Sequence, residues 1–194
     1  MNTLNKDNPA LLVIDMVKDT FDEKKSFPIT PLAKKIIEPV KAIAEAFRSH
    51  EWPVVFATDA YKKEDFIFKG RMKPHSLAGT PGAEVIDELG RKDGDLWLPK
   101  PRLSAFFNTT LDRWLKERGV TLCALAGLTT NFCVLATTID ALCCDFKAVI
   151  LEDCTMASSE KIHEQTLETY RKNVLFPLLR VMTSEELLSE LTTL

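Results

Sequence analysis

Short apolar runs alternate with longer helical patterns along the chain. The first run, Ala10-Leu11-Leu12-Val13-Ile14, is continuous, as expected of a strand that is buried on both faces of a parallel sheet. Similar runs predict further strands at residues 53–58, 95–98, 121–126, 146–151 and 174–182. Helical patterns lie between them at residues 31–49, 109–118, 131–144 and 159–171, and a capping box at residues 183–186 begins a last helix.

The order of these elements predicts an α/β fold. Strands that alternate with helices form crossover units, which give a mainly parallel sheet covered by helices on both faces. The helix at 31–49 should have Thr30 as its N-cap, and Pro39 should kink or divide it. A length of 194 residues suits a single domain over residues 1–194. In such sheets ligands bind beyond the carboxyl ends of the strands, where the strand order reverses.

Composition and charge argue against several classes of function. The net charge is −3 and no dense Lys/Arg run occurs, so the sequence lacks the electrostatic footprint of nucleic-acid binding. No apolar run approaches the ~20 residues that span a bilayer, and the N-terminus has no signal-peptide pattern, so we expect no membrane association. The five cysteines have neither disulfide-framework nor zinc spacing, which makes a cytoplasmic protein with free thiols the simplest interpretation.

Polar residues come directly after the expected strands, where ligands bind in such sheets: Asp15, Asp59, Lys100, Thr129-Thr130 and Asp153. Asp15, at the end of an apolar strand, is either a capping or turn residue or part of a site. Lys100 lies in Pro99-Lys100-Pro101-Arg102, and a lysine between prolines, taken alone, is more often a solvated surface residue. The sequence has no phosphate-binding glycine motif, no H-E-x-x-H and no G-x-S-x-G.

The segment of residues 127–134 is the most informative about chemistry. If Thr130 caps the following helix, Cys133 occupies its first turn, where the helix dipole and free N–H groups favour the thiolate and lower the pKa of the thiol. The alternative is that Cys133 is one more buried thiol on an apolar helix face. His50 and His163 lie on helices away from the strand ends, so a Cys–His dyad is not supported. A carboxylate, an ammonium and a thiol at one sheet edge would provide a base, a charge partner and a nucleophile.

Four blocks of sequence together resemble the isochorismatase-like, or cysteine hydrolase, superfamily, which includes nicotinamidases and N-carbamoylsarcosine amidase. The blocks are residues 12–16 (LVIDM), 79–84 (GTPGAE), 100–107 (KPRLSAFF) and 127–134 (GLTTNFCV), followed by Thr137, Asp140 and Ala141. They keep the family's order and spacing from about Ala10 to Met182. The resemblance implies a three-layer α/β/α sandwich with a six-stranded, mainly parallel sheet.

The same resemblance implies the catalytic residues Asp15, Lys100 and Cys133, and a non-proline cis peptide between Leu128 and Thr129. The backbone N–H groups of Thr129 and Cys133 would form an oxyanion hole. As a hypothesis, Asp15 accepts the thiol proton and passes it to the leaving amine, while Lys100 holds Asp15 and the thiolate charged. Asp15 would then activate the water that cleaves the thioester. Members that cleave the vinyl ether of isochorismate lack the cysteine, so a thiol at this position favours an amide or ureido C–N bond.

The resemblance weakens at the metal site of nicotinamidase-type members, which use an Asp-x-His pair and a second His. This chain keeps Asp59 and His75 but has Tyr61 in place of the first His and Ile67 in place of a further acidic ligand. Two ligands are too few for tight zinc binding. We therefore expect no cofactor, or at most a weakly held divalent metal such as zinc at Asp59 and His75, which counts against nicotinamide as the substrate.

Aromatic residues near these motifs are candidates for the wall of a substrate pocket. They are Phe21, Tyr61, Phe106 and Phe132, with Phe107 as a further aromatic of the same segment. At least two of the phenylalanines are expected to be ordinary core residues instead.

Three functions remain open at this stage. The first is a cysteine hydrolase that cleaves an amide or ureido C–N bond of a small molecule through a thioester. The second is a nicotinamidase with a rebuilt metal site, and the third is a catalytically idle, oligomeric binding protein. A redox sensor at Cys133 is disfavoured because Cys143 lies about 15 Å along the same expected helix. The resemblance implies a homo-oligomer, a dimer or a tetramer, with a small-molecule substrate and no nucleic-acid partner.

Overall fold

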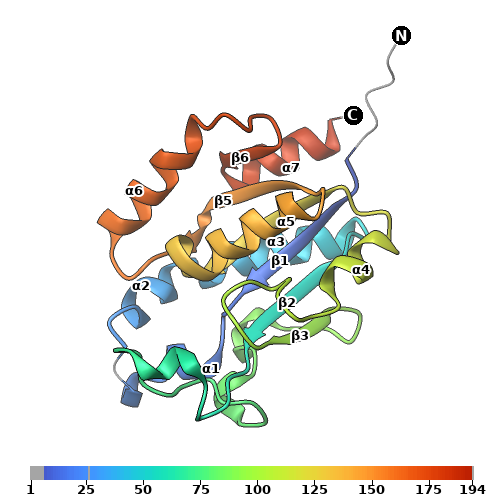
Figure 1. Ribbon diagram of the computed structural model, residues 1–194. Coiled ribbons are helices and arrows are strands. Elements are labelled where there is room, and N and C mark those ends of the chain that lie inside the picture. Colours follow the sequence, from blue (N-terminus) through green and yellow to red (C-terminus); the bar gives the residue numbers. More distant parts are fainter. Residues whose placement is uncertain (1–6, 26, 194) are drawn as a thin grey trace.

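The computed structural model describes residues 7–25 and 27–193. Its centre is a six-stranded sheet in which every neighbouring pair is parallel. The strands are β1 (Pro9–Ile14), β2 (Val54–Asp59), β3 (Leu96–Lys100), β4 (Leu122–Leu128), β5 (Lys147–Met156) and β6 (Leu179–Met182). Their order is β3-β2-β1-β4-β5-β6, so the direction of progression reverses between β1 and β4 (Figure 1). The expected α/β fold is thus confirmed.

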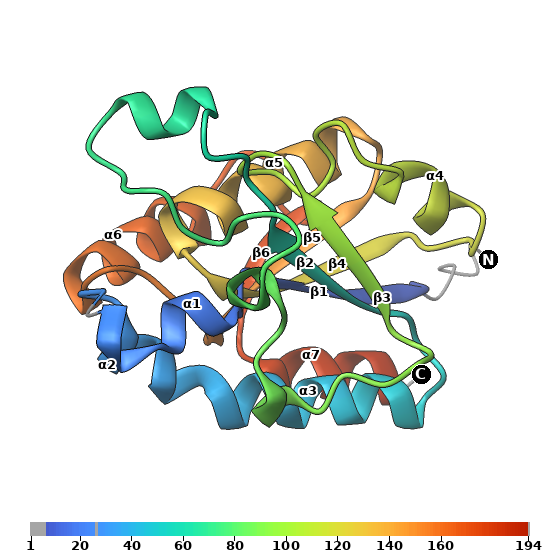
Figure 2. The ribbon, with the colours of Figure 1, turned by 90° about the horizontal axis from the view of Figure 1, so that it is seen from below.

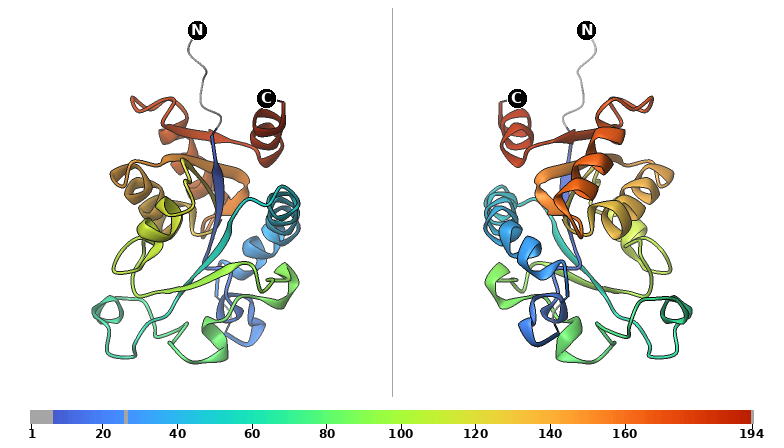
Figure 3. Two further views of the ribbon diagram at one scale, coloured as in Figure 1. Left: turned by 90° about the vertical axis from the view of Figure 1, so that its right-hand side faces the viewer. Right: turned by 90° about the vertical axis from the view of Figure 1, so that its left-hand side faces the viewer.

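Helices cover both faces of this sheet and complete the three-layer α/β/α sandwich. Figure 2 shows α3 and α7 on one side and α4, α5 and α6 on the other, and Figure 3 shows the same separation edge-on. The α-helices are α1 (Lys18–Phe21), α2 (Thr30–Ala33), α3 (Ile37–Ser49), α4 (Leu111–Lys116), α5 (Leu135–Cys143), α6 (Glu160–Arg171) and α7 (Ser184–Thr192). The short 3-10 helices are η1 (Glu23–Lys25), η2 (Lys34–Ile36), η3 (Phe66–Lys69), η4 (Pro81–Ala83) and η5 (Asp87–Leu89), and η6 (Thr130–Val134) is a π-helical turn.

The continuous apolar run of β1 follows from this layering. Leu11 and Val13 belong to the core between the sheet and α3 and α7, whereas Leu12 and Ile14 belong to the core between the sheet and α4, α5 and α6. Because successive side chains of a strand point to opposite faces, a strand covered on both faces needs apolar residues at every position. Every residue of β1 is buried.

The helix expected over residues 31–49 is divided, and its N-cap differs from the expectation. Thr30 is the first residue of α2, not its cap, and its Oγ1 donates to the carbonyl oxygen of Thr20 at 2.6 Å. The division falls at η2, before Pro39. Pro39 itself lies in the first turn of α3, where a missing N–H removes no helical hydrogen bond.

Two strand ends differ from the sequence pattern in ways that matter for the site. The edge strand β3 continues to Lys100 through Pro99, because an edge strand tolerates a residue that cannot donate to the ladder. Asp153 lies within β5 and not after it, and its carboxylate accepts from the N–H and hydroxyl of Ser184. The expected capping box is present at Thr183 and begins α7.

The strand expected at 174–182 is confined to β6, because residues 174–178 form a turn with a cis peptide between Phe176 and Pro177. Over the residues described, no helix is long and apolar enough to cross a membrane.

Candidate active site

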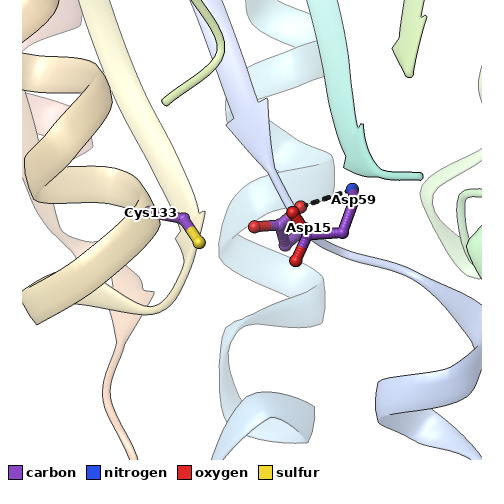
Figure 4. A group of neighbouring side chains, drawn as sticks. All are labelled: Asp15, Asp59 and Cys133. Atoms are coloured by element: carbon purple, nitrogen blue, oxygen red, sulfur yellow. Dashed lines mark hydrogen bonds between the residues drawn. The ribbon is translucent and has the colours of Figure 1, made fainter. Parts of the chain in front are cut away.

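The carboxyl ends of β1 and β4 meet where the strand order reverses, and Asp15 lies directly after β1. Its backbone is left-handed, with φ 52°, a conformation that costs energy for a residue with a Cβ. Two contacts fix it: the Asp15 N–H donates to the carbonyl oxygen of Ala57 at 2.9 Å, and Oδ1 accepts from the Asp59 N–H at 2.8 Å (Figure 4). The backbone therefore holds this carboxylate in one place beside β2.

Lys100 is the last residue of β3 and is fully buried, so the interpretation as a solvated surface lysine is wrong. Its Nζ lies 2.9 Å from Asp15 Oδ2 and donates a short hydrogen bond to Asp59 Oδ1. It also donates to the carbonyl oxygen of Arg102 at 3.2 Å. An ammonium without water needs such partners, and the two carboxylates supply them.

Cys133 lies in the π-helical turn η6, which joins β4 to α5. Its Sγ and one carboxylate oxygen each of Asp15 and Asp59 all lie within 4.8 Å of one another. Figure 4 shows the thiol directed toward the two carboxylates. A π-helical turn inside a helix is rare and frequently occurs at functional sites.

The close approach of β4 to β1 depends on Gly127. Its φ is +101°, and a Cβ added there would lie 2.0 Å from the carbonyl oxygen of Ile14. Only glycine allows this approach, because any side chain would collide with the backbone immediately before Asp15. The glycine in the GLTTNFCV block thereby brings the carboxylate and the thiol to the same sheet edge.

The electrostatics of the cluster place its protons differently from the sequence-based expectation. Burial, and then the negative charges of Asp15 and Asp59, raise the pKa of Cys133 well above its usual range, against the opposing effect of Lys100. The expectation that the helix start lowers the pKa of this thiol is therefore wrong, because desolvation of the charged form outweighs the helix dipole. The resting thiol holds its proton.

Asp15 and Lys100 are shifted in ways that suit a proton acceptor and a permanent cation. Burial and the neighbouring charge of Asp59 raise the pKa of Asp15 from 3.8 to about 7, while Lys100 opposes this shift. Burial alone would lower the pKa of Lys100, but Asp15, Cys133 and Asp59 outweigh it and raise the pKa well above the usual range. The site therefore combines an ammonium, a protonated thiol and a carboxyl group whose raised pKa suits a proton acceptor near neutral pH.

Thr130 does not cap the helix that carries the thiol. The cap position is Thr129, without a side-chain cap, and Thr130 Oγ1 lies 2.9 Å from His163 Nδ1 in a buried contact. Sequence reasoning placed His163 away from the site, because nothing along the chain indicates that α6 packs against η6.

The peptide bond between Leu128 and Thr129 is cis. This is the same bond for which the family resemblance implies a cis geometry.

A cavity of about 480 Å³ opens above the cluster. Tyr61 and Phe132 line it, together with Asp15, Asp59, Thr129 and Cys133. The expectation that Phe21 and Phe106 line it is wrong, because Phe21 packs against the core under α3 and Phe106 against Phe146 in the other core. Phe107 is half-exposed and lies over a separate surface groove.

Much of the cavity wall comes from the segments after β1 and β2, where the sequence had singled out only the residues at the expected metal position. The remaining lining residues are Thr20, Phe27, Ile29, Ile67, Arg71, Met72, His75, Leu103 and Leu128. The apolar ones among them, such as Phe27, Ile29 and Met72, follow no helical or strand period, so their only signal was apolar character outside the regular elements. An apolar residue in a loop is a cue for a binding wall, but a weak one.

The residues at the expected metal position do not fit a divalent cation. Asp59 is paired with the buried ammonium of Lys100, which stands as the cation between the carboxylates. Tyr61 offers a phenol whose pKa is raised by burial and by Asp59, so it stays neutral. His75 packs edge-on against Phe27, and its Nδ1 lies 2.9 Å from the carbonyl oxygen of Lys73, which can only accept. These donors do not form the three- or four-ligand set that zinc requires.

Comparisons with known proteins show the family to which this fold belongs. A family model described as the isochorismatase domain matches residues 9–186. The crystal structure of N-carbamoylsarcosine amidase from Thermoplasma acidophilum is 32% identical, with a TM-score of 0.79, and the match covers 92% of this chain and 97% of that one.

Two curated relatives carry more specific names. A probable inactive nicotinamidase of Arabidopsis thaliana is 32% identical over 166 residues, which covers 80% of this chain and 84% of the relative. A ureidoacrylate amidohydrolase of Klebsiella pneumoniae is 39% identical over 82 residues, 42% of this chain and 35% of the relative. With the family model matched over most of its length, this chain belongs to the isochorismatase family of hydrolases.

Proposed function

We propose that this protein is a cysteine amidohydrolase that cleaves an amide or ureido C–N bond of a small molecule through a thioester. The observation that carries the proposal is the thiol of Cys133 facing the carboxylate of Asp15 at the base of a cavity large enough for a small substrate. A thiol beside a base, with the base held by a third group, is the arrangement that nucleophilic catalysis requires. Lys100 is that third group.

In the first half of the reaction, Sγ of Cys133 attacks the substrate carbonyl carbon as its proton moves to Asp15. The resulting oxyanion is held by the backbone N–H groups of Thr129 and Cys133, both of which line the cavity. The tetrahedral intermediate then collapses, the C–N bond breaks, and the leaving nitrogen takes the proton from Asp15. The products of this half are a free amine or ammonia and an acyl or carbamoyl thioester on Cys133.

In the second half, Asp15 accepts a proton from a water molecule as the water oxygen attacks the thioester carbonyl. The C–S bond breaks, the acid is released, and the sulfur regains its proton from Asp15. A carboxyl group with a pKa of about 7 suits both directions of transfer at neutral pH, because neither its protonated nor its ionised form is scarce.

The names of two relatives support a carbamoyl or ureido substrate. One is an N-carbamoylsarcosine amidase and the other a ureidoacrylate amidohydrolase, and both names describe cleavage beside a carbonyl that carries nitrogen. The third relative, a probable inactive nicotinamidase, raises the idle-binder alternative. The juxtaposition of Cys133, Asp15 and Lys100 favours an active enzyme over that alternative.

Nicotinamide hydrolysis remains the second candidate function. It is disfavoured because Tyr61 occupies the position of a metal-ligating histidine and Asp59 is engaged by Lys100. Phe132 and Tyr61 nevertheless give the cavity aromatic walls, so nicotinamide is included in the test.

The test is an ammonia-release screen over simple amides, carbamoyl amino acids, alkyl ureas and nicotinamide, with and without added Zn²⁺ or Mn²⁺. We expect turnover of a carbamoyl or amide compound that disappears in Cys133→Ala and survives in Cys143→Ala, a matched removal of an exposed thiol. Turnover by Cys133→Ala would end the mechanism. Nicotinamide hydrolysis that needs the metal would replace the proposal by the second candidate.

A further inference from the structure

The cavity has a single cationic side chain in its wall, Arg71. Among the lining residues that the structure describes, it is the only lysine or arginine, and it is exposed, so it stands at the mouth of the cavity and not at its base. It lies two residues beyond η3, and His75 and Met72 line the cavity beside it.

Arg71 also differs from the other arginines of the chain. Each of the others has a partner: Arg48 with Asp95, Arg91 with Trp97, Arg102 with Asp65, Arg113 with Glu117, Arg118 with Trp114, Arg171 with Glu152 and Arg180 with Glu190. Arg71 makes no ion pair, hydrogen bond or ring contact with any residue in the described part of the chain. Its guanidinium is therefore available to a ligand in the cavity.

The base of the cavity, at the other end from Arg71, is negatively charged. At its base lie the carboxylates of Asp15 and Asp59 with the single ammonium of Lys100 behind them, a group with a formal charge of −1 when both carboxylates are ionised. Most of the wall between the two ends is apolar, including Phe27 and Leu103. An anionic group on a substrate would be repelled at the base and attracted at the mouth.

We propose that Arg71 binds a carboxylate of the substrate, so that the enzyme prefers amides or ureas of small acids over their uncharged counterparts. The planar fork of a guanidinium matches a carboxylate with two parallel hydrogen bonds. With the carboxylate at Arg71, the other end of the molecule points toward Cys133, so the same contact selects and orients the substrate. This inference rests on the proposed function for the identity of the reacting end.

The test separates charge selectivity from turnover by using alkylating probes that react with the thiol in one step. N-bromoacetyl-β-alanine carries a carboxylate, and N-bromoacetyl-3-methylbutylamine replaces it with an uncharged isopropyl group of similar size. The second-order rate of Cys133 alkylation by each probe is measured by intact-protein mass spectrometry in a Cys143→Ala, Cys144→Ala background, which removes the two cysteines that are not buried. The variants are Arg71→Met, which keeps the apolar stem, and Lys73→Met, which removes an exposed charge from the same loop but not from the cavity wall.

We expect the unmodified chain to favour the anionic probe, and Arg71→Met to lower the ratio of the two rates by about fivefold, as for one exposed ion pair. Arg71→Lys should restore part of the ratio, and 0.5 M NaCl should reduce it. An unchanged ratio in Arg71→Met, or an equal loss in Lys73→Met, would overturn the inference. Selective alkylation without hydrolysis of any amide or urea would uphold Arg71 as the carboxylate site and overturn the proposed function alone.

Discussion

Removal of the Lys100 ammonium is the most demanding test of the buried cluster. Lys100 is fully buried, and its Nζ contacts both Asp15 and Asp59. The substitution Lys100→Met keeps most of the apolar stem and removes only the charge and its hydrogen bonds. The folded protein would then contain two neighbouring buried carboxylates without a cation between them.

The expected cost is large because the two remaining carboxylates are buried side by side. Breaking a buried ion pair by removing one partner typically costs about 3 to 5 kcal/mol. For a chain of this size that corresponds to a drop in Tm of roughly 10 °C. A double variant, Lys100→Met with Asp59→Asn, removes one of the stranded carboxylates and should recover part of the loss.

The pH dependence of the loss follows from the direction of the Asp15 shift. The pKa of Asp15 is already raised to about 7 by burial and by Asp59, and Lys100 is the group that opposes the rise. Without Lys100 the pKa of Asp15 should lie higher still. The folded variant can then bind a proton as the pH falls, so the free energy lost relative to the parent should be largest at pH 8 and smaller at pH 6.

The measurement is urea denaturation of the parent and the variants at pH 6 and pH 8. Lys18→Met is the matched control, because Lys18 also contacts two carboxylates, Glu84 at 3.0 Å and Asp87 at 3.1 Å, but on the surface. The control should change the free energy of unfolding by less than about 1 kcal/mol. If Lys100→Met is as mild as the control at pH 8, the account of a buried, charge-balanced cluster is wrong.

Three further outcomes are expected. The kcat/KM of the enzyme should rise with pH through about 7, because the base form of Asp15 is lost below that pKa, and Asp15→Asn should lower kcat/KM by roughly 10³-fold. Gly127→Ala should destabilise the fold by more than about 3 kcal/mol in a thermal melt, whereas Gly94→Ala, with open space around it, should be nearly neutral. His163→Ala and Thr130→Val should each slow alkylation of Cys133, and the double variant should be no slower than the singles, since both remove one hydrogen bond; additive effects would refute this coupling.

The strands were predictable because burial on both faces of the sheet requires an apolar residue at every position. All five residues of Ala10–Ile14 are apolar, so this run predicts a buried strand. Their order was not, because the hydrophobic pattern does not say which strands are neighbours. Lys100 shows the consequence. Between two prolines it has the local character of a solvated residue, and its burial depends on carboxylates from two other strands.

The candidate site was predictable where it lies in the sequence blocks and unpredictable where loops form it. Phe106 and Phe132 are both aromatic residues of such blocks, yet only Phe132 lines the cavity. Which way such a ring points depends on how the loop crosses the sheet edge. Arg71 lies outside every block, and its place in the cavity wall depends on the path of the loop after β2.

The high pKa of Cys133 is compatible with nucleophilic attack because the site conserves its total charge. Attack by a free thiolate would need a buried negative sulfur before the substrate arrives, which burial and Asp15 both oppose. Transfer of the thiol proton to Asp15 instead exchanges one negative charge for another a few ångströms away, and Lys100 stays close to it throughout. The developing charge then passes to the substrate oxygen, which leaves the sulfur neutral in the thioester. A buried cluster with a fixed ammonium therefore favours the concerted proton transfer over a preformed thiolate. It predicts that the thiol reacts fastest when a carbonyl is bound beside it.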